Sequence, residues 1–527
     1  MRLRSIAIAL LCMVAACSVR VERNPDVMVS TLNADPTILN PVLASDANAS
    51  SVTAYIYESL IERDNQTLEE MPRLAERWDI SNDGLTFTFY LRKDVKWQDG
   101  KPFSADDVIY TFNQIMDPKV DSARLRNYFR DVKKAEKIDD YTVRFTFAYP
   151  YFRALQMVGG MSIIPKHLFD TGVDFNTNPL NRTPLGTGPY RFKEWVSGSR
   201  VILERNEDYW REKPRITGIV YKIIADSTVL FQLLKKGAID TATIQPIQWV
   251  RQTESKHFNK LFRKYKYYPP NRYFIAWNHR KPYFSDKRVR RALTLLINRK
   301  EMLDKLFFGQ GILVTSTVYR FGPNFDPNIK PLPYDPAAAV KLLDEAGWVD
   351  HDGDGVRDKD GVKFEFDYLM RAGSKQGKSI GLIMRQDLGR VGIEVNIRQL
   401  EGATMFKLLN ERNYDSMSFG WVGPPEDDPY QVWHSTQMEK GSNVIGFQNK
   451  RIDEIVEQVR REFDPEKRKA LLYEFQEILY EEQPYTFLYT LADLVVLSQR
   501  FIDVKEYPLG LDMIEWGVKP GVKILEW

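Results

Sequence analysis

Four aspartates near the middle of the chain have the spacing of a calcium-binding loop. Asp350, Asp352, Asp354 and Asp358 stand at positions 1, 3, 5 and 9 of such a loop, where calcium takes oxygen ligands. Gly361 stands at position 12, where an EF-hand carries its bidentate acid, so calcium should bind weakly. A β-turn rich in Asp and Gly explains the same string, and both interpretations stay open.

A second group of candidates lies where a predicted strand ends in glycines, prolines and acids. Loops at the carboxyl edge of an α/β sheet commonly hold ligands. Aromatic side chains there could form tolerant apolar walls, and the acids could pair with a cationic group, although a solvated acidic loop explains them equally well. The candidates for ligand contact are Trp421, Gly423, Glu426, Asp427, Asp428, Tyr430 and Trp433.

The sequence contains no recognisable catalytic motif. None of its five histidines has metalloenzyme spacing, and there is no GxSxG string and no P-loop. A chain with 71 acidic residues always offers some pair of carboxylates, so counting cannot dismiss a secreted glycosidase, but no pair stands out. We therefore predict that the protein is not an enzyme.

Composition limits the remaining classes. A chain of 527 residues exceeds one hydrophobic core, so two or three domains are expected. The formal net charge is only +3, which gives no bulk field for attracting nucleic acid, and we expect no nucleic-acid partner.

The N-terminus has the features of a bacterial export signal. Arg2 and Arg4 precede an apolar run over residues 6–16, which is too short to span a bilayer as a mature helix. The string that ends this run, Val-Ala-Ala-Cys, is similar to a lipobox, and we expect residues 1–17 to be a lipoprotein signal with Cys17 as the lipidated residue. A plain signal peptide with an incidental cysteine is the alternative. Residues 18–527 contain no cysteine, so no disulfide is expected there.

The first half of the chain predicts alternating strands and capped helices. Strands are expected over 27–32 and 85–91, and a hairpin over 132–138 and 142–147. Ser104 and Asp107 have capping-box spacing, which predicts a helix that starts there.

The second half predicts an α/β lobe. We expect one long helix over 285–308, and a helix after Asp335-Pro336 that ends before Gly347. Helix, strand, helix and strand then alternate between 374 and 421, a pattern typical of an α/β fold. Two charged helices follow, the second opened by Asp464-Pro465, with strands over 485–489 and 494–497.

Several strings occur together in the order found in one family. They are WxDGxPxxAxDVxY over 97–110, GTGPY over 186–190, NxxYW over 206–210 and PYFSDKRVRRA over 282–292. In this the chain resembles the family 5 extracytoplasmic solute-binding proteins of ABC transporters. The resemblance implies an α/β fold of the periplasmic-binding-protein-like type II, cluster C, with two lobes about a hinge and an extra inserted domain. It implies the boundaries 25–55, 183–275 and 495–527 for lobe I, 56–182 for inserted domain II, and 276–494 for lobe III.

The resemblance also implies a function. The protein would be lipid-anchored outside the cytoplasmic membrane, capture oligopeptides or dipeptides between its closing lobes, deliver them to the permease subunits, and work as a monomer without a cofactor. A nickel chelate or an oligosaccharide as the ligand, or a surface receptor lipoprotein without transport, are the alternatives.

Three more site residues come from the resemblance, together with one departure from it. Tyr128, Tyr273 and Asn33 match positions that approach ligand in relatives, although each could equally be structural. Well-known oligopeptide binders pair an aspartate with the peptide's ammonium group, and Pro425 stands at the matching place here, followed by three acids.

Overall fold

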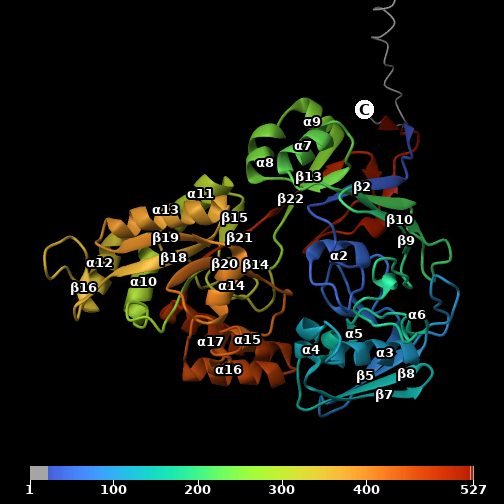
Figure 1. The fold of residues 1–527 in the computed structure, drawn as a ribbon, viewed down its shortest axis with the longest axis horizontal. Helices are drawn as coiled ribbons and strands as arrows, with labels where there is room; N and C mark the ends of the chain where they lie inside the picture. Colours follow the sequence, from blue (N-terminus) through green and yellow to red (C-terminus); the bar gives the residue numbers. More distant parts are fainter. Residues whose placement is uncertain (1–21, 523, 526–527) are drawn as a thin grey trace, which may run out of the picture.

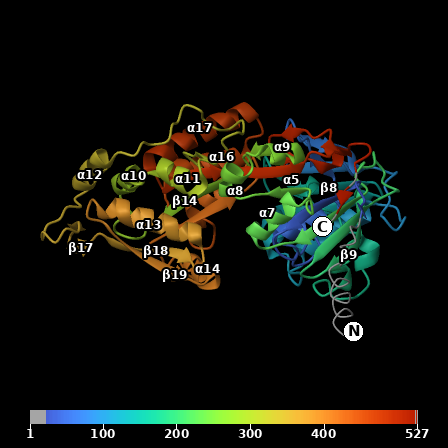
Figure 2. The same ribbon diagram turned by 90° about the horizontal axis from the view of Figure 1, so that it is seen from above.

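The computed structural model describes residues 22–522 and 524–525. Cys17 and the predicted signal segment lie outside the described residues. Two bodies lie side by side: one holds residues up to Tyr267 together with the C-terminal segment, and the other holds Asn271–Leu491 (Figures 1 and 2). Among residues 22–522 we find no helix with both the length and the apolarity that a bilayer span requires.

Lobe I is built on two small sheets. The first has the order β2-β11-β10-β9, with β2 parallel to β11 and the other pairs antiparallel. The second has the order β12-β22-β13. The strands are β2 (Val27–Leu32), β9 (Tyr190–Val196), β10 (Arg200–Arg205), β11 (Gly218–Ile223), β12 (Thr241–Thr243), β13 (Phe262–Tyr267) and β22 (Asp493–Ser498). The helices are α2 (Ala47–Thr53), α7 (Ser227–Lys235), α8 (Pro246–Gln252) and α9 (Lys256–Leu261).

The inserted domain is an antiparallel sheet with helices packed on it. Its strand order is β5-β6-β8-β7, and the predicted capping box at Ser104 and Asp107 is confirmed at the start of α3. Its main elements are β5 (Ala75–Ile80), β6 (Thr86–Leu91), α3 (Ala105–Met116), α4 (Ala123–Phe129), β7 (Val132–Asp139), β8 (Thr142–Phe147), α5 (Ala154–Gly159) and α6 (Lys166–Phe169).

A buried carboxylate joins the inserted domain to lobe I and explains two of the family strings. Glu58 accepts hydrogen bonds from Thr187 Oγ1 at 2.8 Å, Tyr209 Oη at 2.8 Å and Trp210 Nε1 at 2.9 Å. Arg73 Nε completes the set at 2.8 Å. GTGPY and NxxYW therefore serve the domain junction, since both supply donors to one buried charge.

Lobe III contains a six-stranded mixed sheet with a separate core on each face. The strand order is β15-β21-β14-β20-β18-β19. Helices α10 to α13 pack on one face, and α15, α16 and α17 pack on the other. The strands are β14 (Asn271–Trp277), β15 (Gly311–Leu313), β18 (Glu365–Arg371), β19 (Glu394–Leu400), β20 (Ser416–Val422) and β21 (Tyr485–Leu491). The helices are α10 (Lys287–Leu296), α11 (Arg299–Phe307), α12 (Pro336–Glu345), α13 (Lys375–Gly389), α14 (Gly402–Asn410), α15 (Tyr430–Trp433), α16 (Lys450–Arg461) and α17 (Pro465–Glu482).

The single helix predicted over 285–308 is wrong. The chain forms α10 and α11 instead, because Asn298 takes a non-helical conformation and its side chain caps α11 by accepting from the Glu301 N–H at 3.1 Å. Asparagine favours such N-cap positions over helix interiors, so the residue itself signals the break.

The described chain passes between the two bodies only twice. Tyr268–Pro270 connects β13 of lobe I to β14 of lobe III, and Ala492 alone separates β21 from β22 on the way back. The boundaries expected at 275/276 and 494/495 lie close to these crossings, although the whole of β14 pairs within the lobe III sheet. Two short adjacent links are what relative movement of two lobes requires.

Candidate functional site

The predicted ligand loop forms one wall of a small pocket. This pocket lies where β14 begins and the antiparallel strand β20 ends. Arg272 stands directly opposite Trp421 in this antiparallel pair, so the two side chains share one face of the sheet. The pocket has a volume of about 40 Å³, and its other polar lining residues include Glu426, Asp427 and Asp428. The structure thus brings five of the predicted residues together, since Trp421 and Trp433 line the pocket with these three acids, and it adds an arginine that sequence reasoning did not select.

Two of the three acids are already engaged with arginines. Glu426 Oε1 accepts from Arg468 Nε at 2.9 Å and from Asn324 Nδ2 at 3.1 Å. Asp428 Oδ2 lies 3.0 Å from Arg460 Nε. These pairs hold the loop against α16 and α17, which is a structural role for both acids.

Asp427 lies between two arginines without a hydrogen bond to either. Its Oδ2 is 3.7 Å from Arg272 Nη1, and its Oδ1 is 3.6 Å from Arg153 Nη1 of the inserted domain. The surrounding protein desolvates this carboxylate and raises the pKa of Asp427, while the two guanidinium groups act in the opposite direction. Gly423 permits the arrangement, because a Cβ there would lie 2.6 Å from Asp427 Oδ2.

Arg272 is the residue that sequence reasoning missed. It is only 2% exposed, and within the described part of the chain its buried Nε and Nη2 atoms have no hydrogen-bond partner. Burial lowers the pKa of Arg272, and the nearby Asp427 opposes that effect. The available signal was an arginine at an inward position of the apolar strand 271–277, because lone charges are rarely fully buried.

The other two aromatic candidates of the loop pack inside lobe III. Trp433 is 1% exposed and donates from Nε1 to Thr317 Oγ1 at 3.0 Å. Tyr430 stacks on His434 at 4.4 Å between ring centroids, and Arg460 lies 4.6 Å from its ring. The side chain of Trp433 is thus part of the core, and that of Tyr430 supports the Asp428 ion pair.

Tyr273 belongs to a second pocket of about 150 Å³ in lobe III. Tyr273 pairs with Gly420 and points to the face opposite Arg272, where its ring lies 5.8 Å from that of Tyr489. A Cβ at residue 420 would lie 2.8 Å from the Tyr273 ring, so the glycine makes room for it. Ser374 and Gln376, at the N-terminal end of α13, also line this pocket.

Asn33 lies in a third and larger pocket, in lobe I. This pocket has a volume of about 650 Å³, and Tyr55, Gln245 and Trp516 are among its lining residues. Asn33 Oδ1 accepts from Asn48 Nδ2 at 2.9 Å. Tyr128 lines none of the three pockets; it is 55% exposed on α4. The structure therefore separates Asn33, Tyr273 and Tyr128 into different surroundings.

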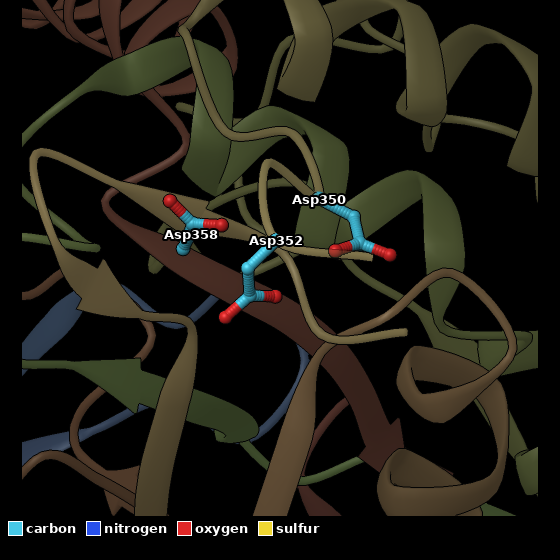
Figure 3. Close-up of side chains that lie close together, drawn as sticks. All are labelled: Asp350, Asp352 and Asp358. Carbon is cyan, nitrogen blue, oxygen red and sulfur yellow. The ribbon is translucent and has the colours of Figure 1, made fainter. Parts of the chain in front are cut away.

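The aspartate string forms a turn in which three of the four carboxylates approach one another (Figure 3). Oxygens of Asp350, Asp352 and Asp358 lie within 4.8 Å. Asp354 lies outside this group and pairs with Lys363, which also lies 3.5 Å from Asp352 Oδ2. Only three of the four aspartates expected to bind calcium therefore lie together, and the ammonium group of Lys363 lies beside them.

The turn also uses its acids to fix its own backbone. Asp350 accepts from the N–H groups of Gly353 at 2.7 Å and Gly355 at 2.9 Å. Asp358 accepts from the His351 N–H at 2.9 Å. These bonds are those of an Asp-Gly turn, the alternative that the sequence left open.

Comparison with known proteins decides the family. Residues 69–443 match the bacterial extracellular solute-binding proteins, family 5 Middle. The chain belongs to this family. The oligopeptide-binding protein AppA of Bacillus subtilis (strain 168) is 29% identical to this family 5 protein over 506 residues, which cover 92% of this chain and 90% of AppA. The family consists of solute-binding proteins, which agrees with the prediction of a binding protein.

Solved structures confirm the two-lobed α/β fold expected for family 5. AppA from Bacillus subtilis in complex with a nonapeptide superposes with a TM-score of 0.78 at 27% identity, covering 94% of this chain and 99% of that one. NikZ from Campylobacter jejuni in complex with Ni(L-His) gives a TM-score of 0.79 at 26% identity, covering 94% and 100%.

Proposed function

We propose that this family 5 protein is the substrate-binding component of an ABC importer and that it binds peptides between lobe I and lobe III. The observation that carries the proposal is the arrangement of pockets beside the two interlobe links. The Arg272 pocket and the Tyr273 pocket begin on β14, directly after Tyr268–Pro270, and the lobe I pocket includes Tyr267, directly before it. Ligand that touches both lobes would favour the closed arrangement by its differential affinity.

The likeness to AppA supports a peptide as the ligand. AppA is an oligopeptide-binding protein by name, and its structure contains a nonapeptide. The pockets of this chain combine aromatic rings with polar groups, as in the Tyr273 pocket with Ser374, Gln376 and Tyr489. Such linings can satisfy a peptide backbone while tolerating varied side chains.

A metal chelate is the second candidate, favoured by the similar fold and identity of NikZ with Ni(L-His). Thermal-shift measurements with di- to nonapeptides, nickel–histidine and oligosaccharides would separate the candidates, because a ligand that binds only the folded protein raises Tm. Stabilisation by peptides alone is expected. Stabilisation by nickel–histidine or a sugar, with no response to peptides, would overturn the peptide proposal and leave the binding-protein class intact.

Attachment and delivery complete the proposal. Lipid at Cys17 would anchor the protein, as a monomer, to a bacterial membrane outside the cytoplasm, and the loaded protein would dock on the permease subunits. A Cys17→Ser variant should lose the lipid mass and leave the membrane fraction. Retention of the variant in that fraction would count against the lipid anchor but not against peptide binding.

A further inference from the structure

The buried guanidinium of Arg272 is an unused carboxylate-binding group. Nε and Nη2 lie on the same edge of the planar guanidinium, the edge that can hold a carboxylate through two parallel hydrogen bonds. Both atoms are buried and lack a partner among the described residues. An unpaired buried donor is costly, so its presence points to a partner that arrives with the ligand.

The surrounding acidic groups only partly neutralise the positive charge of Arg272. Asp427 is the one acid within 4.0 Å of Arg272 in the described chain, and the same carboxylate also faces Arg153. Two guanidinium groups therefore share one carboxylate and form no hydrogen bond with it. The neighbouring acids do not help, because Glu426 pairs with Arg468 and Asp428 with Arg460.

The size of the pocket limits what can enter. Its volume of about 40 Å³ is roughly that of three water-sized groups. A carboxylate fits such a space, whereas a large side chain does not. The apolar part of the wall, which includes Val318, Trp421 and Phe475, excludes water from the charged contact and strengthens it.

We propose that the Arg272 pocket binds a carboxylate of the ligand, so that this protein selects peptides through an acid group at this end of the site. The inference rests on the proposed peptide function. The resemblance implies that an acid of this loop binds the positively charged ammonium group of the peptide. The proposal instead places a negatively charged group of the ligand at this end of the site. The carboxylate can come from the C-terminus of a peptide or from an acidic side chain.

Three peptide pools test the proposal and distinguish these sources. The first contains di- to nonapeptides of Ala, Leu, Phe, Ser and Lys with free C-termini, the second is the same pool with amidated C-termini, and the third is the amidated pool with one Glu in each peptide. Apparent affinities are measured by thermal shift and calorimetry on the intact mature protein. We expect the free-acid pool to bind roughly 10- to 100-fold more tightly than the amidated pool. Recovery with the Glu pool would assign the carboxylate to a side chain.

The Arg272→Met variant then tests the residue. It should abolish the preference for acid over amide while keeping or raising the Tm of the ligand-free protein, because an unpaired charge is replaced by an apolar side chain of similar length. Arg290→Met is the control: Arg290 is 3% exposed in the same lobe, and it donates to carbonyl oxygens of Phe284, Ser285 and Glu482. This control should lower Tm and leave the acid preference unchanged.

The Arg272→Lys variant provides a second test of the residue in case the Arg272→Met variant does not fold. It keeps the charge but loses the two-nitrogen edge, so the acid preference should fall about tenfold. Equal binding of all three pools by the native protein, or an undiminished preference for carboxylate-bearing peptides in both Arg272 variants, overturns this inference alone. Failure of all three pools to bind overturns both the inference and the peptide function.

Discussion

Tyr151 of the inserted domain donates a hydrogen bond of 3.2 Å to Asp428 of lobe III, the same carboxylate that faces Arg460. The Phe152 N–H adds a bond of 2.9 Å to the Arg460 carbonyl oxygen. The inserted domain thus contacts lobe III beside the Arg272 pocket, at a place distant from the two interlobe links in the sequence.

Asp428→Asn should destabilise the protein by about 1–3 kcal/mol, because it leaves the partly buried Arg460 guanidinium without its nearest counter-charge. Tyr151→Phe, which removes only the neutral donor, should cost about 1 kcal/mol. Urea unfolding of both variants measures the difference. Equal costs would show that the tyrosine contact, and not the ion pair, stabilises this junction.

Glu58→Gln should be among the most damaging single changes. The Glu58 side chain is fully buried and receives four donors, including Arg73. The amide would leave Arg73 with only its contact to the partly exposed Glu62, and its own NH2 group would face donors that need an acceptor. We expect a loss of about 3–5 kcal/mol in the free energy of unfolding. Glu62→Gln is the matched control, since Glu62 also pairs with Arg73 but is 24% exposed, and its loss should be within about 1 kcal/mol. A mild Glu58→Gln variant would contradict the role assigned to this junction.

Asp427→Asn tests, without changing Arg272, whether the pocket binds a negatively or a positively charged group of the ligand. Removal of this carboxylate frees both arginines, so affinity for peptides with a free C-terminus should rise roughly fivefold. If Asp427 instead pairs with the ligand ammonium, affinity should fall, and the fall should disappear for N-acetylated peptides. Calorimetry with free and acetylated forms of one peptide distinguishes the two outcomes.

His279 should make lobe III sensitive to acid. Desolvation of its ring, together with Arg290 and Arg280, lowers the pKa of His279 well below 6.5 in the folded protein. The unfolded chain therefore binds a proton that the folded chain does not. The contribution of this neutral ring is intact above pH 6.5 and is lost as the pH falls below it, at up to about 1.4 kcal/mol per pH unit.

Unfolding of the native protein and of His279→Gln at pH 7.5 and 5.0 checks this expectation. The native protein should lose more stability than the variant, because glutamine can still donate to the Pro484 carbonyl oxygen but does not titrate. Parallel losses would show that other groups account for the acid sensitivity.

Calcium should leave the Tm unchanged, because Lys363 already supplies positive charge to the aspartate turn. Melting in calcium and in chelator measures this directly. A rise in Tm with calcium that Asp352→Asn removes would instead establish the three-carboxylate group as a metal site.

Local patterns predicted most elements because their causes are local. The Ser104 and Asp107 capping box, the α12 start at Asp335 and the α17 start at Asp464 all depend on bonds within a few residues. The Asn298 break was missed because apolar periodicity continues across it and outweighed a single capping residue.

The candidate site was predictable only in part, since its chemistry depends on contacts that are distant in sequence. The loop 421–433 was found from its glycines, prolines and acids, but neither the pairing of Glu426 and Asp428 with α16 and α17 nor the approach of Arg153 has a local signal. Arg272 became a candidate only when strand register placed it opposite Trp421. The family strings were informative about the fold because residues such as Tyr209 and Trp210 bind Glu58 at a domain junction.

The two ends of the described chain meet in lobe I, where Glu22 and Arg23 of β1 pair with Leu525 and Ile524 of β27 (Figure 1). The chain therefore leaves lobe I to form lobe III and then returns to lobe I, which contains both ends of the described chain. A lipid at Cys17, and equally a tag fused after Trp527, would attach to lobe I. Lobe III would then move relative to the attached lobe I. A label that reports lobe closure should therefore be placed on lobe III, and its reference label should be placed in lobe I near either terminus.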